Sequence, residues 1–351
     1  MKKLSNKQKY RFLLRIKKAE KKKLKKKRGT QITNKTPSQL VKIDIPQRLD
    51  LLDSFEESVN FFSQIRKISS DKFALFSINF KTLKNISPAA ALIFAAEMDR
   101  VRIIRGSRLK VVDFNKWDNH IKTLLGAMGM YDLLNLIGIT DPFSSTSPAP
   151  AQNGERFIKF QTGEKADGQN ASQFKEAINN VIGKNIPNNK ALQKSLTEAM
   201  TNVSNHAYPE EYLSQTTFKQ KRWWMSASFN NTTNKLTIIF YDQGVGIPTS
   251  ITKTASESFK SLINLFSDGK KISALMKYGR SRTNEPHRGK GLHDIKNYIA
   301  SSNIGNSYFK IYSERGLFVY SKQQECESEN TYDKRSKLKG TLIEWQICLN
   351  Q

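Results

Sequence analysis

The 351-residue sequence contains few cysteines and no long apolar run. A membrane-spanning helix needs about 20 consecutive apolar residues, and no stretch of this chain approaches that length, so we expect no membrane partner. Cys326 and Cys348 are the only cysteines. They are too few for a disulfide framework or for a zinc site with four cysteine ligands. This composition favours a reducing compartment and predicts a cytoplasmic protein.

Acidic residues are almost missing from the first 28 positions. That segment holds 15 Lys and Arg and a single acid, Glu20, so about half of the formal net charge of +27 lies there. Its longest apolar stretch, Phe12-Leu-Leu, is too short for the core of a secretory signal peptide. Such an arm can bind nucleic acid or another polyanion by neutralising phosphates. A solvated, disordered lysine tail without a fixed partner explains it equally well.

Two common nucleotide motifs are also absent. The chain has neither a G-x-x-x-x-G-K-[ST] phosphate loop nor a G-x-G-x-x-G that follows a strand. It does contain Glu198-Ala-Met-Thr-Asn202-Val-Ser-Asn-His206-Ala-Tyr-Pro. On a helix, the carboxylate of Glu198 and the carboxamide of Asn202 lie on one face, one turn apart, where they can hold a water and a metal ion. Taken alone, this pair is more typical of a solvated helix face, and His206 is more typical of a packed or capping residue.

Two glycine-containing segments follow this stretch along the chain. Asp242-Gln-Gly-Val-Gly comes directly after a β-rich run that begins at Lys235, which places the Asp242 carboxylate at a strand end. Arg288-Gly-Lys-Gly precedes an amphipathic helical pattern, and amides at a helix N-terminus favour phosphate. Each segment alone is also compatible with an ordinary turn. The three elements together, in this order, predict an ATP site.

Residues 155–351 resemble the GHKL superfamily, the ATP-binding fold shared by gyrase, MutL, heat-shock chaperones and sensor histidine kinases. The pattern Glu-Ala-x-Thr-Asn-x-x-x-His-Ala-Tyr-Pro is most similar to the anti-sigma-factor serine kinases. Sensor histidine kinases usually carry Lys where this chain has Asn205. Apart from His206, the only histidines are His120, His287 and His293, and none lies in a recognisable dimerising hairpin. The sequence therefore argues against a sensor histidine kinase.

The resemblance implies ATP and Mg²⁺ as cofactors and a role for each matching residue. Glu198 would be the base that orients the attacking hydroxyl or water. Asn202 would be a ligand of Mg²⁺, and Asp242 would accept a hydrogen bond from the adenine amino group. The other matching positions would shape the base pocket or contact phosphates: Gly244, Gly246, Thr341 after Gly340, Gly289, Lys290 and Gly291, with Arg282 as a further phosphate contact.

One residue departs from the family pattern. The third element is normally Gly-x-Gly-x-Gly, and here His287 occupies the first glycine position. This change affects the hinge of the lid or the grip on phosphate, so it bears on hydrolysis more than on binding.

The N-terminal half has its own pattern. Residues 73–80 and 109–114 are predicted strands, and residues 87–98 are a predicted helix with Ser87 at the cap and Pro at the first turn. Strand, helix, strand implies a parallel crossover, and the order resembles a STAS domain, the fold of anti-sigma-factor antagonists. Where those proteins carry Asp-Ser-Ser-Gly, this chain has Asn85-Ile-Ser-Pro. The resemblance makes Ser87 a candidate phosphoacceptor, while a plain helix N-cap is the simpler interpretation.

These observations predict an α/β protein in four parts. A basic arm and linker occupy residues 1–40, a STAS-like α/β domain residues 41–140, and a linker rich in Pro and Ser residues 141–154. A GHKL ATP-binding domain then occupies residues 155–351, with a lid at 248–288.

The ATP-binding domain is expected to be an α/β sandwich with helices on one face of a mixed, mainly antiparallel sheet. Its predicted helices are 171–182 and 188–207, and its predicted strands are 155–161, 222–229, 235–241, 307–313, 316–321 and 341–349.

Two functions of different classes are compatible with this sequence. In the first, the protein is an ATPase or a serine-kinase-type phosphotransferase with a regulatory role, which acts on water, on a protein partner or on its own STAS-like domain. In the second, it is a nucleotide-gated module with little turnover, in which ATP controls dimerisation or the capture of nucleic acid through residues 1–28. The reaction, the partner and a homodimeric state all stay open at this point.

Overall fold

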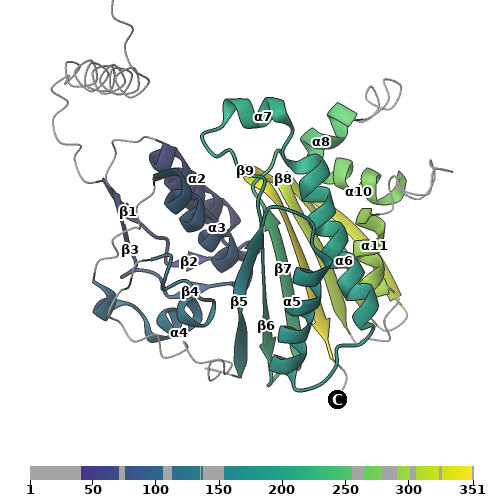
Figure 1. The fold of residues 1–351 in the computed structure, drawn as a ribbon, viewed down its shortest axis with the longest axis horizontal. Helices are drawn as coiled ribbons and strands as arrows, with labels where there is room; N and C mark the ends of the chain where they lie inside the picture. Colours follow the sequence, from purple (N-terminus) through teal and green to yellow (C-terminus); the bar gives the residue numbers. More distant parts are fainter. Residues whose placement is uncertain are drawn as a thin grey trace, which may run out of the picture. The chain divides into compact units, whose positions relative to one another are not determined.

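The computed structural model describes residues 41–70, 76–105, 113–134, 136, 154–254, 265–278, 291–300, 306–323 and 326–349. All of them belong to one compact unit, in which helices flank a central sheet (Figure 1). The predicted basic arm lies outside the described residues, as do most of the predicted linker, Arg282, Gly289, Lys290 and part of the lid. In the described part of the chain, no helix is long and apolar enough to cross a membrane.

A five-stranded antiparallel sheet forms the C-terminal half. Every pairing within this sheet is antiparallel, so the expectation of a mixed sheet is wrong for its described strands. Two of the four pairings are local, because β6–β7 and β8–β9 are hairpins, and a short turn joins only antiparallel strands. Each predicted strand falls on a described strand, but the predicted strand 341–349 covers only the end of a strand that begins at Cys326. In spatial order the strands are β5 (Glu155–Gly163), β6 (Trp223–Asn230), β7 (Lys235–Asp242), β9 (Cys326–Cys348) and β8 (Ser307–Gln323).

Strand β8 joins two strands that the sequence analysis kept apart. The register shifts around Glu314, whose φ is 52°. Before this irregularity, Phe309 and Ile311 face one hydrophobic cluster, and after it Phe318 and Tyr320 face the same cluster. The side chains facing that cluster thus change from odd to even numbers, as expected for a bulge. The bulge lets one long strand keep its apolar side toward the same helices.

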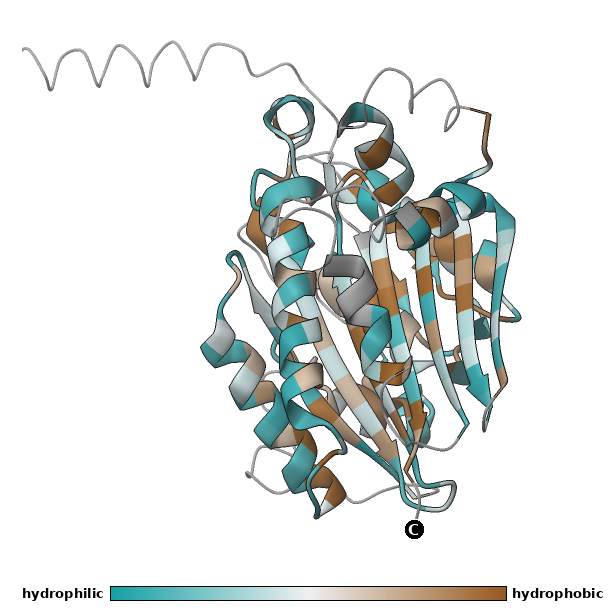
Figure 2. Ribbon diagram, turned by 90° about the vertical axis from the view of Figure 1, so that its right-hand side faces the viewer, coloured by the Kyte–Doolittle hydropathy of each residue, from teal (hydrophilic) through white to brown (hydrophobic). Residues whose placement is uncertain are grey.

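The helices of residues 155–351 that pack on the sheet lie on one face, as the sequence analysis expected, and helices of the N-terminal half cover the other face. Along β6, Trp224 belongs to one buried cluster, and its neighbours Trp223 and Met225 belong to the other. Figure 2 shows this apolar content of the strands in brown. On one face pack α5 (Gly168–Ile182), α6 (Asn189–Asn202), α10 (Asp268–Tyr278) and α11 (Gly291–Ala300); on the other pack α2 (Phe55–Ser70) and α3 (Pro88–Arg105).

The N-terminal part contains two short parallel strand pairs. Strand β1 (Val41–Asp44) pairs with β3 (Phe76–Asn79), and β2 (Arg48–Leu49) pairs with β4 (Asn85–Ile86). The crossover between β1 and β3 runs through α2, which the sequence analysis did not identify, and α3 is the helix predicted from residue 87.

The segment after α3 differs from the predicted strand where it is described. Of the predicted strand 109–114, residue Phe114 lies in a 3₁₀ helix, Phe114–Lys116, and residues 109–112 lie outside the described part. Helix α4 (Asn119–Ala127) follows this 3₁₀ helix. The two parallel strand pairs and their helices form an α/β arrangement, and the STAS likeness stays a prediction.

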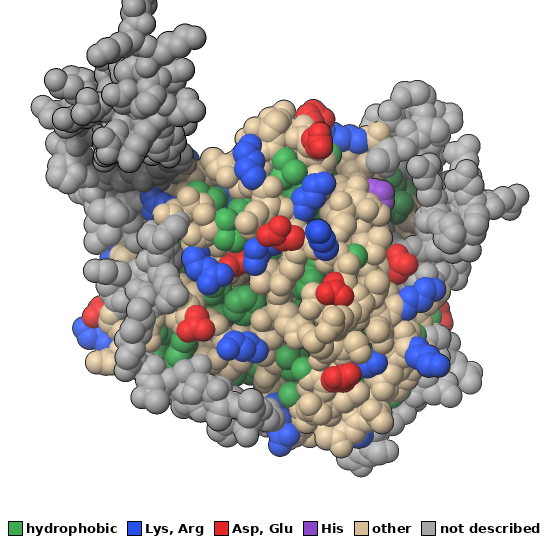
Figure 3. Space-filling view, in the orientation of Figure 1, with side chains coloured by type: hydrophobic (Ala, Val, Ile, Leu, Met, Phe, Trp, Pro, Cys, Tyr) green, Lys and Arg blue, Asp and Glu red, His purple; other side chains and the backbone are tan. Residues whose placement is uncertain are grey.

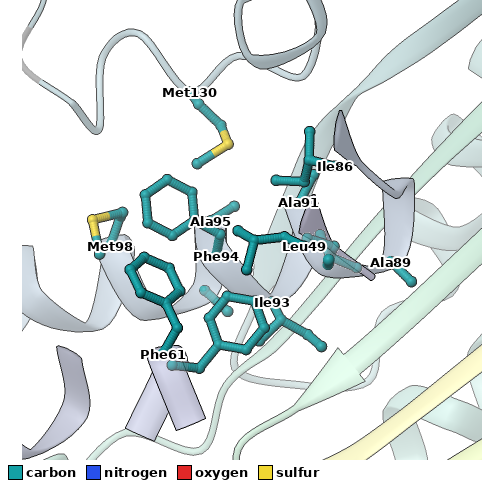
Figure 4. Packing of buried hydrophobic residues seen from close by; sticks show 14 of the residues in the cluster. Leu49, Phe61, Ile86, Ala89, Ala91, Ile93, Phe94, Ala95, Met98 and Met130 are labelled. Atoms are coloured by element: carbon teal, nitrogen blue, oxygen red, sulfur yellow. The ribbon is translucent and has the colours of Figure 1, made fainter. Parts of the chain in front are cut away.

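Helix α3 carries the N-terminal core. Its side chains from Ala89 to Val101 are buried, and Phe94 lies among Phe61 and Phe80, with ring centroids 6.1 and 5.6 Å away (Figure 4). Aromatic rings at these separations and tilted angles attract each other beyond their buried area. The core is therefore built around one helix that is apolar on nearly every side.

Two carboxylates of α3 face the sheet and are fully buried, Glu97 and Asp99. The Asp99 carboxylate accepts hydrogen bonds from Trp224 Nε1 at 3.1 Å and Arg102 Nη2 at 2.7 Å, and it forms an ion pair with Arg222 at 3.1 Å. Buried charges are tolerated only when they are paired and hydrogen-bonded. These contacts fix the orientation of α3 on the sheet.

The surface carries both charge signs. On the described part of the face seen in Figure 3, Lys and Arg side chains are interspersed with Asp and Glu. Single-sign patches of the kind that steer polyanions are not visible on that part. About half of the positive excess of the sequence lies in residues 1–28, outside the described residues.

The core around α3 makes a simple stability prediction. Phe94→Ala leaves a cavity in a fully buried site and should lower the free energy of unfolding by about 3–5 kcal/mol. Urea denaturation followed by tryptophan fluorescence and by circular dichroism measures this cost. The control Leu52→Ala, at a side chain that is 54% exposed, should change it by less than about 0.5 kcal/mol. A small cost for Phe94→Ala would contradict the described packing.

Candidate functional site

Three polar residues form a row across the end of the sheet. Asp242 is the last residue of β7 and lies opposite Thr341 of β9, which in turn lies opposite Ser313 of β8. The hydroxyl oxygens of Ser313 and Thr341 are 3.0 Å apart. By the period of two along a strand, all three side chains share the face of Phe240 and Ile343, which is the face covered by α6. Distant parts of the sequence thus meet in one polar row.

Asp242 is the electrostatic centre of this row. Its side chain is buried, and burial raises its pKa from the usual 3.8 to about 7, although the Gly244 amide donates a hydrogen bond to Oδ1 at 2.7 Å. Burial disfavours the charged form, and a hydrogen-bond donor favours it. A hydrogen-bond donor on a ligand would further stabilise the charged form of this carboxylate, so Asp242 is suited to bind an amino group.

The loop after Asp242 touches the end of the helix that carries Glu198. The amide of Val245 donates a hydrogen bond to the Ala207 carbonyl at 2.8 Å. A Cβ atom on Gly244 would lie 2.3 Å from that carbonyl oxygen, so only glycine permits the approach. Gly246 ends the loop directly before α8 (Ile247–Thr254). The structure therefore brings the first two predicted elements into contact.

Glu198 and Asn202 lie on the last two turns of α6 and are both half-buried. Directly after them the chain forms a π-helical segment, Val203–Ala207, a local distortion frequent at functional sites. The Asn202 side-chain amide nitrogen, Nδ2, is buried and has no hydrogen-bond partner. Because the nitrogen and oxygen of this amide are assigned from their surroundings, the unsatisfied position can present either a donor or an oxygen ligand. Asn202 thus offers an unfilled bonding position beside Glu198.

Helix α11 brings Gly291 toward this pair. The hydroxyl of Tyr298, near the C-terminal end of α11, donates a hydrogen bond to the Pro187 carbonyl just before α6, at 3.4 Å. The two helices pack against each other, and ten residues of α helix span about 15 Å. The N-terminus of α11 therefore lies near the level of Glu198. Gly289 and Lys290, the other members of this predicted element, lie outside the described residues.

Ser87 lies elsewhere. Its hydroxyl oxygen accepts a hydrogen bond from the Ala90 amide at 3.3 Å, so it acts as the N-cap of α3, the simpler of the two sequence interpretations. It lines a pocket with Thr237, five residues before Asp242 on β7, or about 17 Å along the strand. Ser87 also belongs to the α3 side of the sheet, and Glu198 to the α6 side. The structure does not bring these two residues together.

The sequence analysis missed the residues that support the Asp242 loop. The Gln243 amide donates a hydrogen bond to the Tyr208 hydroxyl at 2.9 Å, and the Gln243 carbonyl accepts one from Tyr212 at 3.1 Å. The Gln243 side-chain nitrogen donates to Glu97 of α3 at 3.0 Å. Tyr208 lies in the motif that contains His206, and Tyr212 follows His206 by six residues, so this position was the available signal. Nothing in the sequence indicated the contact with Glu97.

A metal ion at this site would depend on oxygen atoms of a ligand. Among the described residues, no three His, Cys, Asp or Glu side chains cluster to hold a metal ion. Mg²⁺ commonly takes one or two protein oxygens together with phosphates and waters. The unfilled position at Asn202 is compatible with such a ligand set.

Comparison with known proteins adds no family assignment. No protein-family model matches the chain, and no curated protein matches it as a relative.

The turn before Thr341 should tolerate no side chain. Gly340 has φ of 80°, and a Cβ atom there would lie 1.9 Å from the Asp242 carbonyl oxygen. Gly340→Ala should therefore lower the free energy of unfolding by about 3 kcal/mol or more, since backbone strain and a clash add up. Gly183→Ala, with φ of 76° and open space, should cost only about 1 kcal/mol. Equal costs in urea denaturation would show that the clash is absent.

Asp242 should also make stability depend on pH. Its folded pKa of about 7 lies above its usual value of 3.8, so between these values the folded state binds the extra proton. The free energy of unfolding of the ligand-free protein should therefore fall by about 2–4 kcal/mol as pH rises through this window and level off above it. Asp242→Asn should remove this part of the decline in urea denaturation from pH 5 to 8. Parallel profiles for both proteins would refute the assignment.

Proposed function

We propose that residues 155–351 form a GHKL-type site for Mg-ATP. The observation that carries the proposal is the buried Asp242 carboxyl at a strand end, with its pKa raised by burial to about 7, on the sheet face that carries α6. An adenine amino group would add a further donor to this carboxylate, beside the Gly244 amide. Thr341 lies opposite Asp242 and borders the base, with Gly244 and Gly246 shaping the loop beside it.

The phosphates in this proposal lie toward the N-terminus of α11. The first amides of a helix point outward without partners and attract anions. Gly291 opens α11 near the level of Glu198, which supports a ligand that runs from Asp242 toward α6. Gly289, Lys290 and Arg282 remain predicted phosphate contacts. Asn202 would hold Mg²⁺, which when bound would neutralise charge on the phosphates.

Glu198 is the proposed base. Its carboxylate takes the proton of an attacking hydroxyl or water as the new bond to the γ-phosphorus forms and the bond to the departing diphosphate oxygen breaks, leaving ADP. Water as the attacking group gives free phosphate, and a protein serine gives a phosphoserine. Phosphoryl transfer depends mainly on positioning and charge neutralisation, so misplacing Glu198 would abolish turnover but spare binding.

The second function, a nucleotide-gated module with little turnover, is favoured by one contact. Gln243 directly follows Asp242 and donates its side-chain hydrogen bond to Glu97 of α3, so the layer formed by α2 and α3 is bonded to the residue next to the proposed adenine contact. A change at the base pocket could thus reach this layer. The position of Ser87 gives no support to phosphoryl transfer within one molecule. A cytoplasmic location, a protein partner and nucleic-acid capture by residues 1–28 belong to the same proposal.

Calorimetric titration with adenosine and with Mg-ATP tests the site. Asp242→Asn replaces a charge-assisted acceptor by a neutral one, so adenosine affinity should fall about tenfold at pH 8. In the wild type, adenosine affinity should fall by about tenfold per unit as pH drops below 7, because a protonated carboxyl must first lose its proton. The Asn variant should lack this dependence. Asp132→Asn, at an exposed position, is the control that should change neither quantity.

The same samples separate binding from turnover. Glu198→Gln should bind Mg-ATP within about twofold of the wild type and lose phosphoryl transfer about 100-fold or more, as expected for a lost general base. Transfer is followed with γ-labelled ATP into free phosphate and into protein. Tight binding without either product would leave the gated module. No binding of adenosine or ATP to the folded protein would refute the nucleotide site.

A further inference from the structure

A pocket of about 360 Å³ opens beside the Asp242 loop, between Arg66 of α2 and residues of α7 (Glu210–Gln215) and α8. Arg66 of α2 and Leu338 line it, and the buried Leu338 belongs to the cluster that packs against α2 and α3. The side chains of Asp242 and Thr341, in contrast, lie on the α6 face. The pocket therefore does not include the side chains of Asp242 and Thr341, although Val245 and Gly340 beside them line it.

The charges around this pocket do not cancel. Among the described residues, Lys339 forms no ion pair with a carboxylate. The other cations that line the pocket are each paired: Lys253 with Glu211 at 3.0 Å, Lys337 with Glu314 at 2.9 Å, and Arg66 with Glu97. One positive charge is thus left over, and it is carried by Lys339.

Lys339 is held in place without an ion pair, although the Asp242 and Glu314 carboxylates act to raise its pKa. Its ammonium nitrogen lies 4.2 Å from the centre of the Tyr212 ring, a cation–π contact, and its side chain is half-buried. Burial and the neighbouring Arg66 guanidinium lower the pKa of Lys339 to about 8. Both effects disfavour the charged form, so a negative ligand beside this ammonium would be stabilising.

Arg66, which also lines the pocket, carries an unsatisfied hydrogen-bond donor. The Nε–H of Arg66 is buried and has no hydrogen-bond partner, although the guanidinium is paired with Glu97. Buried donors without partners are uncommon in folded proteins, and they point to a missing ligand or water. An arginine and a lysine that converge on a small pocket are the donor set that proteins use for oxyanions.

We propose that this pocket binds a small free oxyanion, carried by a phosphate or a carboxylate group, with Lys339 as its direct contact. The volume suits a small ligand. Val245, Leu338 and the ring of Tyr212 supply an apolar wall on which the body of such a ligand can rest. The anion neutralises the charge of Lys339, as Glu211 neutralises that of Lys253 and Glu314 that of Lys337.

The anion would also weaken the adenine contact, a consequence that rests on the proposed function. The Lys339 charge favours the ionised form of Asp242. A bound anion opposes that effect, so fewer Asp242 carboxylates would be ionised near pH 7. Because coupling between two sites is reciprocal, adenosine would in turn weaken anion binding by the same factor.

Calorimetric titration with inorganic phosphate and with succinate, at constant ionic strength set by chloride, tests the site. At least one anion should bind the full-length wild-type protein saturably, and the preferred one identifies the group carried by the ligand. Lys339→Met should weaken binding about tenfold or more, the loss expected when a charge-assisted contact is removed. Lys339→Arg should retain binding, and Lys42→Met, at an exposed position, should match the wild type while changing the net charge equally.

Lysine-selective NMR of the wild type gives a readout that does not depend on the folding of a variant. The pKa of Lys339, about 8 without ligand, should rise when the anion is added. Binding of neither anion, or equal binding by Lys339→Met and Lys42→Met, would overturn the proposal. Anion binding without any response to adenosine would leave the anion site standing and count against the adenine site alone.

Discussion

The burial of the sheet on both faces is the constraint on which the rest of the structure depends. Side chains alternate between the two faces along a strand, so consecutive residues at the end of β7 serve different layers. Asp242 shares the α6 face, and the next residue, Gln243, reaches Glu97 on α3. A sheet with one solvated face would leave Gln243 in water. Here the same two residues connect the polar row at the end of the sheet to the layer formed by α2 and α3.

The sequence predicted the elements of the C-terminal half better than their arrangement. The strands at β5, β6 and β7 and the helices α5 and α6 follow from local periodicity and were placed within a few residues. The antiparallel pairing throughout the sheet and the cover of α2 and α3 on its second face depend on contacts between distant residues. No periodicity encodes those. The bulge that unites both halves of β8 depends on the left-handed conformation of Glu314, a conformation that a non-glycine residue seldom adopts.

Some residues of the candidate site could be predicted from the sequence, and others could not. Asp242, Gly244 and the pair Glu198 and Asn202 were found because each lies in a short motif with its own chemistry. Their support was not found: Gln243 bonds to Tyr208, 35 residues earlier, and to Glu97, 146 residues earlier. Lys339 gave no signal either, because an unpaired cation can be recognised only once the partners of its neighbours are known. Short motifs identify the residues proposed to contact the ligand. The residues that hold those in position become visible only in the fold.

The bulge at Glu314 decides more than the bend of a strand. Beyond it, the outer half of β8 pairs only with β9 and presents Phe318 and Tyr320 to the cluster shared with α10 and α11. Since the side-chain period is two, the register shifts on both sides of Glu314 decide which side of the outer hairpin faces those helices. Without them, its aromatic side would face away from those helices, and its polar side would face their apolar surface. This irregularity thus sets which face of the hairpin the helices bury.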